Sequence, residues 1–373
     1  MDIYQRLVQH LDNLPGGFPS TESGVELRIL KRPFTPDDAE LALCLSLIPE
    51  EPRVIARRAG ISCEDTERRL AKMVDKGLIF CIYPEDGSPQ YQAIQFAVGL
   101  WECQVDKLDP DFVKDMDEYW PILFDLEVWK KTPQLRTIPV NVSIDFQREV
   151  MAYEHAGELV RAYKKIAVAP CICRREQKMK DRGCDKPEET CLLFGKFSDY
   201  WLHQGMARQI DQQETLDILM QADEFGLVLQ PSNSKEAAFI CCCCGCCCAV
   251  LRNIKRHPKP ASIVSTPFAL TINSATCTGC ETCIDRCQTE ALRLETDKAV
   301  MNKDRCIGCG LCVSTCPTDS LALMRKPASE QPDVPRDFNH TLIKLGKNRG
   351  KLSNAGMAKM LVKSKMDRFL AAR

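Results

Sequence analysis

The pattern of hydrophobic and polar positions predicts helices followed by a hairpin in the first hundred residues. The segment PDDAELALCLSL, residues 36–47, has a helical period, and EPRVIARRAG followed by CEDTERRLAKMVDKGLI predicts two helices separated by a glycine turn. LIFCIY and YQAIQFA then flank the turn PEDGSP, which is typical of a β-hairpin.

This order of elements resembles a winged-helix module over residues 34–97 of an N-terminal domain, residues 1–100. A winged helix invites a DNA-binding hypothesis, but the expected recognition helix opens with Glu64, Asp65 and Glu67. Between Phe34 and Tyr91 there are eleven acidic and seven basic residues. Because phosphate contacts from Lys and Arg supply most non-specific DNA affinity, we expect a docking or structural role and no nucleic-acid partner.

The segments on either side of the cysteine-rich part have simpler patterns. Residues 101–165 are predicted to be a helical connector, with helices over 109–131 broken at Pro121 and another over 147–165. Residues 327–373 are a proline-rich linker and a basic tail. For this tail we expect either a solvated terminal helix or a docking surface for an acidic redox partner.

Composition places the chain among ordinary globular proteins and makes its cysteines the main chemical signal. Its 373 residues are 45% hydrophobic and carry a formal charge of −1. No run of 18 apolar residues and no secretory pattern at the N-terminus is found, so we expect a cytoplasmic protein without a membrane span. Disulfides are rare in a reducing cytosol, so the 23 cysteines indicate metal binding or redox chemistry.

Two cysteine runs share one spacing. CTGCETCIDRC begins at Cys277 and CIGCGLCVSTC at Cys306, and both have the pattern C-x₂-C-x₂-C-x₃-C. Zinc sites usually take two C-x₂-C pairs, whereas each run here has a third and a fourth cysteine. The runs resemble the bacterial two-cluster ferredoxin, over residues 268–325 of a domain spanning 263–326, which implies two [4Fe–4S] clusters.

The ferredoxin resemblance also implies which cysteines share a cluster, because the fourth cysteine of each run binds the other cube. The first cube would be held by Cys277, Cys280, Cys283 and Cys316, and the second by Cys306, Cys309, Cys312 and Cys287. One position departs from the pattern, since Gln288 follows Cys287 where proline is usual. We expect this glutamine to change the surroundings of the second cube without removing a ligand.

A second set of cysteines lies upstream, in a domain spanning residues 166–262. Cys171, Cys173, Cys184 and Cys191 precede the run CCCCGCCC at residues 241–248. One hypothesis is a reduced core strand; the other is at least one further iron–sulfur cluster. The candidate ligands of that cluster are Cys171, Cys173, Cys184, Cys191, Cys241, Cys243, Cys244, Cys247 and Cys248.

Strand alternation and the spacing suggest how these ligands divide. Cys171, Cys173, Cys184 and Cys191 are four candidate ligands for one cubane. On a strand, Cys241, Cys243 and Cys247 would serve one cluster, while Cys242, Cys244 and Cys248 face another or stay free. The CCG at 243–245 resembles the cysteine motif of heterodisulfide reductase-type subunits, which implies a non-cubane cluster.

Together these features predict an α+β multidomain protein with a βαβ-βαβ two-cluster module. Residues 166–325 resemble multidomain ferredoxin-like proteins of anaerobic bacteria, which implies single-electron transfer between a donor and an acceptor protein. One alternative is an oxidoreductase subunit whose upstream cluster is catalytic; another is a redox-responsive winged-helix regulator. No G-x-G-x-x-G fingerprint is present, so we expect the electrons to come from a partner protein.

Overall fold

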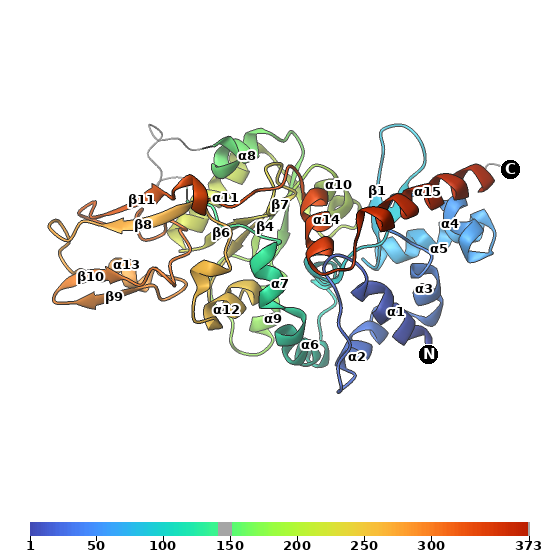
Figure 1. Ribbon diagram of the computed structural model, residues 1–373, viewed down its shortest axis with the longest axis horizontal. Helices are drawn as coiled ribbons and strands as arrows, with labels where there is room; N and C mark the ends of the chain where they lie inside the picture. The colour runs from blue at the N-terminus through green and yellow to red at the C-terminus, as the bar shows by residue number, and fades with distance from the viewer. Residues whose placement is uncertain (141–150, 372–373) are drawn as a thin grey trace. The chain divides into compact units, whose positions relative to one another are not determined.

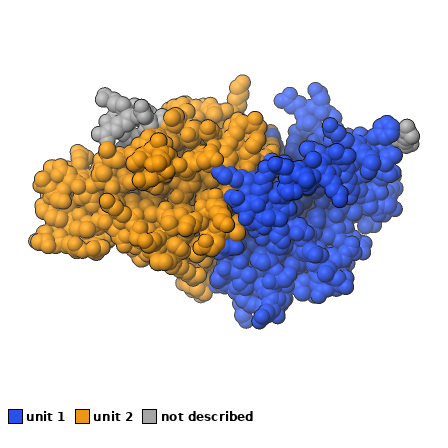
Figure 2. Space-filling view, viewed as in Figure 1, with its two compact units in different colours: residues 1–125, 199–207, 342–373 blue, residues 126–198, 208–341 orange. Residues whose placement is uncertain are grey.

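The computed structural model describes residues 1–140 and 151–371 and mixes helices with short strands (Figure 1). The chain forms two compact units (Figure 2). Unit 1 holds residues 1–125, 199–207 and 342–373, and unit 2 holds residues 126–198 and 208–341. These units cross the domain boundaries expected from the sequence, because the C-terminal residues join the N-terminal ones.

Unit 1 contains the helices and the hairpin that the hydrophobic pattern predicts. Its elements begin with α1 (Ile3–Asp12), α2 (Val25–Lys31), α3 (Pro36–Ala42), α4 (Pro52–Ala59), α5 (Cys63–Asp75), β1 (Phe80–Ile82) and β2 (Gln90–Gln92). Helix α4 ends at Gly60, which has a left-handed φ of 69°, and Ser62 caps the start of α5. The likeness of this order to a winged helix stays a prediction.

The helical connector differs from the prediction in two places. After η1 (Phe96–Leu100) and η2 (Glu102–Gln104), α6 (Pro110–Leu123) continues through Pro121. The helix ends at Leu123, two residues after Pro121, whose missing N–H and ring weaken its last turn. The helix expected over 147–165 is limited to η4 (Ala152–Glu154) and α8 (Ala156–Arg161), and residues 147–150 lie outside the described residues.

The basic tail contains more helix than expected, and its last helix packs against α4 in unit 1. It contains α14 (Phe338–Asn348) and α15 (Asn354–Ala371). In unit 1, Asp367 of α15 pairs with Arg58 Nε of α4 at 2.6 Å, and Ser364 Oγ donates to buried Glu50 Oε1 at 2.5 Å. The hypothesis of a purely solvated terminal helix is therefore wrong, and partner docking by this tail stays a prediction.

Unit 2 is built on a five-stranded antiparallel sheet in the order β5-β3-β4-β7-β6. Its strands are β3 (Ile166–Pro170), β4 (Glu189–Phe194), β5 (Arg208–Ile210), β6 (Val228–Pro231) and β7 (Phe239–Cys243). The helices of this region are α7 (Leu126–Lys131), α8, α9 (Ile172–Lys178), α10 (Lys196–His203), α11 (Gln212–Glu224) and α12 (Ala249–Arg256), with α10 continuing into unit 1.

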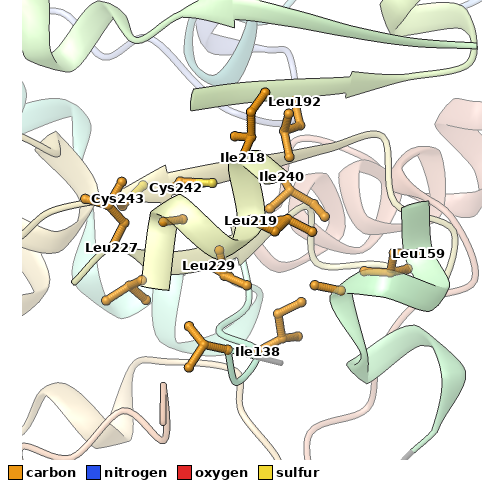
Figure 3. Close-up of a cluster of buried hydrophobic side chains, with 14 of the residues drawn as sticks. Ile138, Leu159, Leu192, Ile218, Leu219, Leu227, Leu229, Ile240, Cys242 and Cys243 are labelled. Atoms are coloured by element: carbon orange, nitrogen blue, oxygen red, sulfur yellow. The ribbon is translucent and has the colours of Figure 1, made fainter. Parts of the chain in front are cut away.

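The core of unit 2 includes cysteines as well as aliphatic side chains. Figure 3 shows Cys242 and Cys243 among residues such as Ile218, Leu219 and Leu227. Two residues of the second cysteine run, Ile307 and Leu311, belong to the same buried cluster. The second run is therefore anchored in the core of the sheet.

The segment with the two cysteine runs contains two pairs of antiparallel strands. β8 (Phe268–Ile272) pairs with β11 (Leu321–Arg325), and β9 (Leu292–Glu295) pairs with β10 (Lys298–Met301). A short helix, α13 (Thr282–Asp285), lies within the first run, and η5 (Pro260–Ser262) and η6 (Ala328–Glu330) flank the segment. Throughout the described residues, no helix has the length and apolar character needed to cross a membrane.

Candidate iron–sulfur centres

The cysteines of the two runs form two sets, each with three members from one run and one from the other. In the first set, burial raises the pKa of the Cys283 thiol, and the neighbouring thiols add to the increase. The first cysteine set consists of Cys277, Cys280, Cys283 and Cys316. The structure thus places Cys316 beside the run that begins at Cys277.

The second cysteine set mirrors the first. Burial raises the pKa of Cys309 to about 12, and Cys287 and Cys306 raise it further. Burial and the neighbouring thiols also raise the pKa of Cys312. The second cysteine set consists of Cys287, Cys306, Cys309 and Cys312. The ferredoxin resemblance implies these two sets, and both the division of the cysteines between two clusters and their binding of iron stay predictions.

The fourth cysteine of each run is held by an equivalent hydrogen bond. The Ala291 N–H lies 3.1 Å from Cys287 Sγ, and the Ser320 N–H lies 3.3 Å from Cys316 Sγ, in both cases four residues later in the chain. Bonds from the Thr318 backbone and hydroxyl lower the pKa of Cys316 against the opposing effect of partial burial. Donors aimed at sulfur favour the thiolate, which is the form that binds iron.

Glycines between the ligands allow the loops to turn in close contact with other backbone. Gly279 and Gly308 have φ values of 69° and 65°, in the left-handed region. A Cβ at Gly279 would lie 2.5 Å from the Asp297 carbonyl oxygen, and one at Gly308 would lie 2.5 Å from that of Phe268. Both positions therefore require glycine for conformation and for space.

Six upstream cysteines form a continuous group in unit 2. Cys191 on β4 lies directly opposite Cys241 on β7 in the strand register. Interactions between neighbouring thiols then run in the order Cys171, Cys173, Cys248, Cys243, Cys241 and Cys191, which we call the six-cysteine group. Cys171 precedes α9 and Cys248 precedes α12, so two helix starts and two strands supply the sulfurs.

Four other cysteines form a tighter group. Its sulfurs all lie within 4.8 Å of one another, and its members, which we call the four-cysteine group, are Cys184, Cys244, Cys246 and Cys247. The Sγ–Sγ distances are 3.8 Å from Cys184 to Cys244, 3.5 Å from Cys184 to Cys247 and 3.8 Å from Cys246 to Cys247. These distances far exceed a disulfide bond of about 2.05 Å.

The structure divides the upstream cysteines differently from the strand argument. Cys184 lies apart from Cys171, Cys173 and Cys191, and Cys247 joins Cys244 and not Cys241. The reason is that β7 ends at Cys243, so strand alternation does not extend through the rest of the run. Gly245, inside the run, is the sequence signal for that end, and it could also have identified the omitted Cys246 as a turn residue.

Cys242 belongs to neither group. Its side chain is buried in the hydrophobic core, and burial raises its pKa to about 12. It therefore behaves as a small apolar residue on the opposite face of β7 from Cys241 and Cys243.

The comparisons with known proteins bear on the two runs only. Residues 270–323 match the family described as a 4Fe-4S dicluster domain. The chain carries an iron–sulfur domain. No curated protein and no solved structure matches the chain. Iron–sulfur binding by this ferredoxin-like domain is thus supported by the family match together with the geometry of its cysteines.

A buried arginine lies between the upstream cysteine groups. Arg174 on α9 is fully buried, and its guanidinium donates to Thr190 Oγ1 and, at 2.8 Å, to the carbonyl oxygen of Cys242. Although burial lowers it, nearby cysteines of both groups raise the pKa of Arg174 overall; they are Cys171, Cys244, Cys243 and Cys184. Among the described residues, its Nε has no hydrogen-bond partner.

Cysteine sulfurs surround the buried guanidinium of Arg174. A buried guanidinium is costly unless an opposite charge lies close to it. The neighbours that raise the pKa of Arg174 are the sulfurs of Cys171, Cys244, Cys243 and Cys184. Thiolates placed this close together repel one another, and one arginine cannot neutralise them all. This part of unit 2 therefore suits sulfur that is bound to a metal ion. Sequence reasoning missed Arg174, since nothing in CICRRE separates it from Arg175.

The ferredoxin-like domain contacts the upstream region through its second cysteine set. Gln288, which follows Cys287, accepts a hydrogen bond from the Gly245 N–H at 2.7 Å through its side-chain Oε1. A Cβ at Gly245 would lie 2.6 Å from the Gln288 carbonyl oxygen, so the two segments touch backbone to backbone. Gln288, the one departure from the ferredoxin pattern, is therefore the residue that joins the two cysteine regions.

Two further contacts hold the same interface. Arg286 pairs with Asp223 of α11 at 2.7 Å and donates to the Glu224 carbonyl oxygen at 3.0 Å. The Val140 N–H donates to the Cys309 carbonyl oxygen at 3.2 Å. The second cysteine set thus lies against the cysteine-rich sheet, while Cys280 of the first set is exposed.

Proposed function

We propose that this protein transfers single electrons through two [4Fe–4S] clusters, between a partner protein and at least one further iron–sulfur centre in the upstream region. The first cysteine set would hold one cluster and the second set the other. A [4Fe–4S] cluster bound by four thiolates takes up and releases one electron at a time.

The hydrogen bond between Gly245 and Gln288 is the main observation in support of this proposal. It connects the residue next to a ligand of the second set with the turn that bears Cys244 and Cys246. The buried side chains Ile307 and Leu311 hold the same run in the core of the sheet. A separate ferredoxin joined by a linker would not need such packing, so the arrangement supports electron exchange within the molecule.

The exposed end of the domain suits an external partner. Cys280 is exposed, and a hydrogen bond from the Thr282 hydroxyl is the main cause that lowers the pKa of its thiol. We place the docking of the redox partner at this first set, and transfer inward at the second. The direction of physiological flow follows from the partner's potential.

A second candidate function is supported by the size of the six-cysteine group. A cubane has four iron corners, and this group offers six sulfurs, of which Cys171, Cys173, Cys191 and Cys241 are only partly buried. A centre with more thiolates than a cubane needs is compatible with a non-cubane, disulfide-reductase-like cluster that is itself catalytic. In that case the ferredoxin-like domain would supply its electrons.

Replacing Gln288 tests the relay. Gln288→Ala removes the acceptor for the Gly245 N–H without removing a sulfur ligand, so we expect unchanged iron content but slower reduction of the upstream centre. Freeze-quench EPR after mixing with a reduced low-potential donor would follow each centre. Gln213→Ala is the matched control, because this exposed glutamine bonds only within α11, to Asp217. Equal rates in wild type and Gln288→Ala would contradict the proposed route.

A further inference from the structure

The four-cysteine group differs in size from every other cysteine set in the described residues. It is the one group in which all sulfurs lie within 4.8 Å of one another. The first and second cysteine sets, which match a cubane-binding family, do not form such a tight group. The two kinds of site in one structure therefore call for different occupants.

The spacing of the sulfurs matches a single tetrahedral ion. Zinc–sulfur bonds are about 2.3 Å long, so the edge of a tetrahedron of four thiolates around zinc is about 3.8 Å. The Sγ–Sγ separations are 3.8 Å for Cys184–Cys244, 3.5 Å for Cys184–Cys247 and 3.8 Å for Cys246–Cys247. In a cubane each thiolate binds a different iron atom, which sets the sulfurs further apart.

We propose that Cys184, Cys244, Cys246 and Cys247 bind one zinc ion in a closed tetrahedral site, separate from the iron–sulfur centres. Four thiolates complete the coordination of zinc, leaving no open position for a substrate. The role of the ion is then structural.

The local chain geometry shows what the ion would hold together. Cys244 follows the last residue of β7, and its carbonyl oxygen accepts from the Cys248 N–H at 3.1 Å, closing a turn before α12. Cys184 comes from the loop between α9 and β4. The ion would therefore join that loop to the turn containing Gly245, which bonds to Gln288.

The charge around the site is also suitable. Zinc with four thiolates carries two negative charges, and the buried guanidinium of Arg174 interacts with both Cys184 and Cys244. The N-terminus of α12, an eight-residue helix, starts next to Cys247 and adds a partial positive charge. Both features offset the charge of a thiolate-bound ion.

Metal analysis of the full-length protein, purified anaerobically, tests the proposal. We expect about one zinc per chain in the wild type, in addition to iron and acid-labile sulfide. Cys184→Ser with Cys247→Ser should remove the zinc and leave iron and sulfide unchanged. Cys44→Ser with Cys63→Ser is the matched control, since both cysteines lie in unit 1 outside every group.

A second measurement covers the case of poor folding of the double variant. Wild-type protein produced in cobalt-supplemented, zinc-depleted medium should show the intense thiolate-to-cobalt charge-transfer bands of tetrahedral sulfur coordination. Absence of both zinc and these cobalt bands would overturn the proposal. So would a loss of about four iron atoms with the cysteine pair, because that loss identifies a cubane. The electron-transfer proposal would survive either result, because a cubane at this site would itself be a further iron–sulfur centre, and an empty site would leave the six-cysteine group as that centre.

Discussion

Arg174 shows how one buried side chain reports on the chemistry around it. It has no exposed surface, and cysteines of both upstream groups supply its opposing charge. Interactions with neighbouring thiols and burial raise the pKa of Cys171 and Cys243, so a further cation such as a metal ion is needed to keep them as the thiolates that would balance the guanidinium. The arginine and the thiolates therefore depend on each other.

Arg174→Met should destabilise unit 2 and lower its metal content. Loss of one partner of a buried charge pair costs about 3 to 5 kcal/mol, whereas an exposed ion pair contributes roughly 1 kcal/mol or less. The control is Arg208→Met, because Arg208 is half-exposed and pairs with Glu189 and Glu214 at the surface. Anaerobic thermal unfolding and iron analysis would measure both variants. Equal midpoints for the two would contradict the assigned role.

Gly245 is a second residue whose substitution has a defined outcome. Its φ is not in the left-handed region, so the effect of Gly245→Ala comes from the 2.6 Å approach to the Gln288 carbonyl oxygen. Overpacking of this kind costs about 1 to 3 kcal/mol. We expect a lower midpoint of thermal unfolding and weaker coupling between the two cysteine regions.

Gly157→Ala is the control for this prediction. It lies in α8 of the same unit, and its nearest neighbour is a side-chain atom of His155 at 3.2 Å, which can move. Because alanine favours helix over glycine by about 0.5 to 1 kcal/mol, this variant should be close to wild type. A midpoint for Gly245→Ala as high as that of Gly157→Ala would show that the close approach is unimportant.

Among the elements, the two cysteine runs are best tested by paired substitutions, because each predicted set takes three cysteines from one run and the fourth from the other. In the structure, Cys316 lies with the first set and Cys306 with the second. Cys277→Ser with Cys316→Ser should therefore affect one cluster and remove about four iron atoms per chain. Cys306→Ser with Cys316→Ser should affect both clusters and remove about eight. The reverse result, with about eight iron atoms lost from the first pair and about four from the second, would mean that each run holds its own cluster.

The elements also show how far the sequence could lead. The hairpin β1–β2, the hairpin β9–β10 and the strands β8 and β11 were predictable, because period-two patterns and turn residues are local signals. The end of β7 at Cys243 was missed, although Gly245 signals it, and its pairing with Val228 of β6 is seen only in the folded chain. For the same reason, the position of Cys184 in the sequence does not indicate that its side chain lies beside Cys244 and Cys247.

The site was therefore predicted in part. The grouping of the two runs into sets came from the ferredoxin resemblance, which includes long-range information that no local rule contains. The roles of Gln288 and Arg174 arise from contacts across 43 and 68 residues of sequence, to Gly245 and Cys242. Such contacts become visible only when the chain is folded.

At the scale of the whole molecule, we expect that unit 1 does not bind DNA. Glu64 and Asp65 occupy the first turn of α5, and the nearby Arg68 and Arg69 are both paired with Asp65. We expect no appreciable binding of the full-length protein to random duplex DNA at physiological salt, as measured by fluorescence anisotropy. Replacing Glu64 and Asp65 with lysine should raise the affinity. Tight, salt-sensitive binding of the wild type would instead favour the regulator hypothesis.

The whole account depends on an iron–sulfur centre beyond the ferredoxin-like domain, and iron counting tests this most directly. The two cysteine sets of that domain account for about eight iron and eight sulfide per chain. Iron and acid-labile sulfide should be measured in anaerobically purified wild type and in Cys171→Ser with Cys173→Ser, which removes one end of the six-cysteine group. We predict more than about eight iron atoms in the wild type and a return toward eight in the variant. About eight in both proteins would contradict the account.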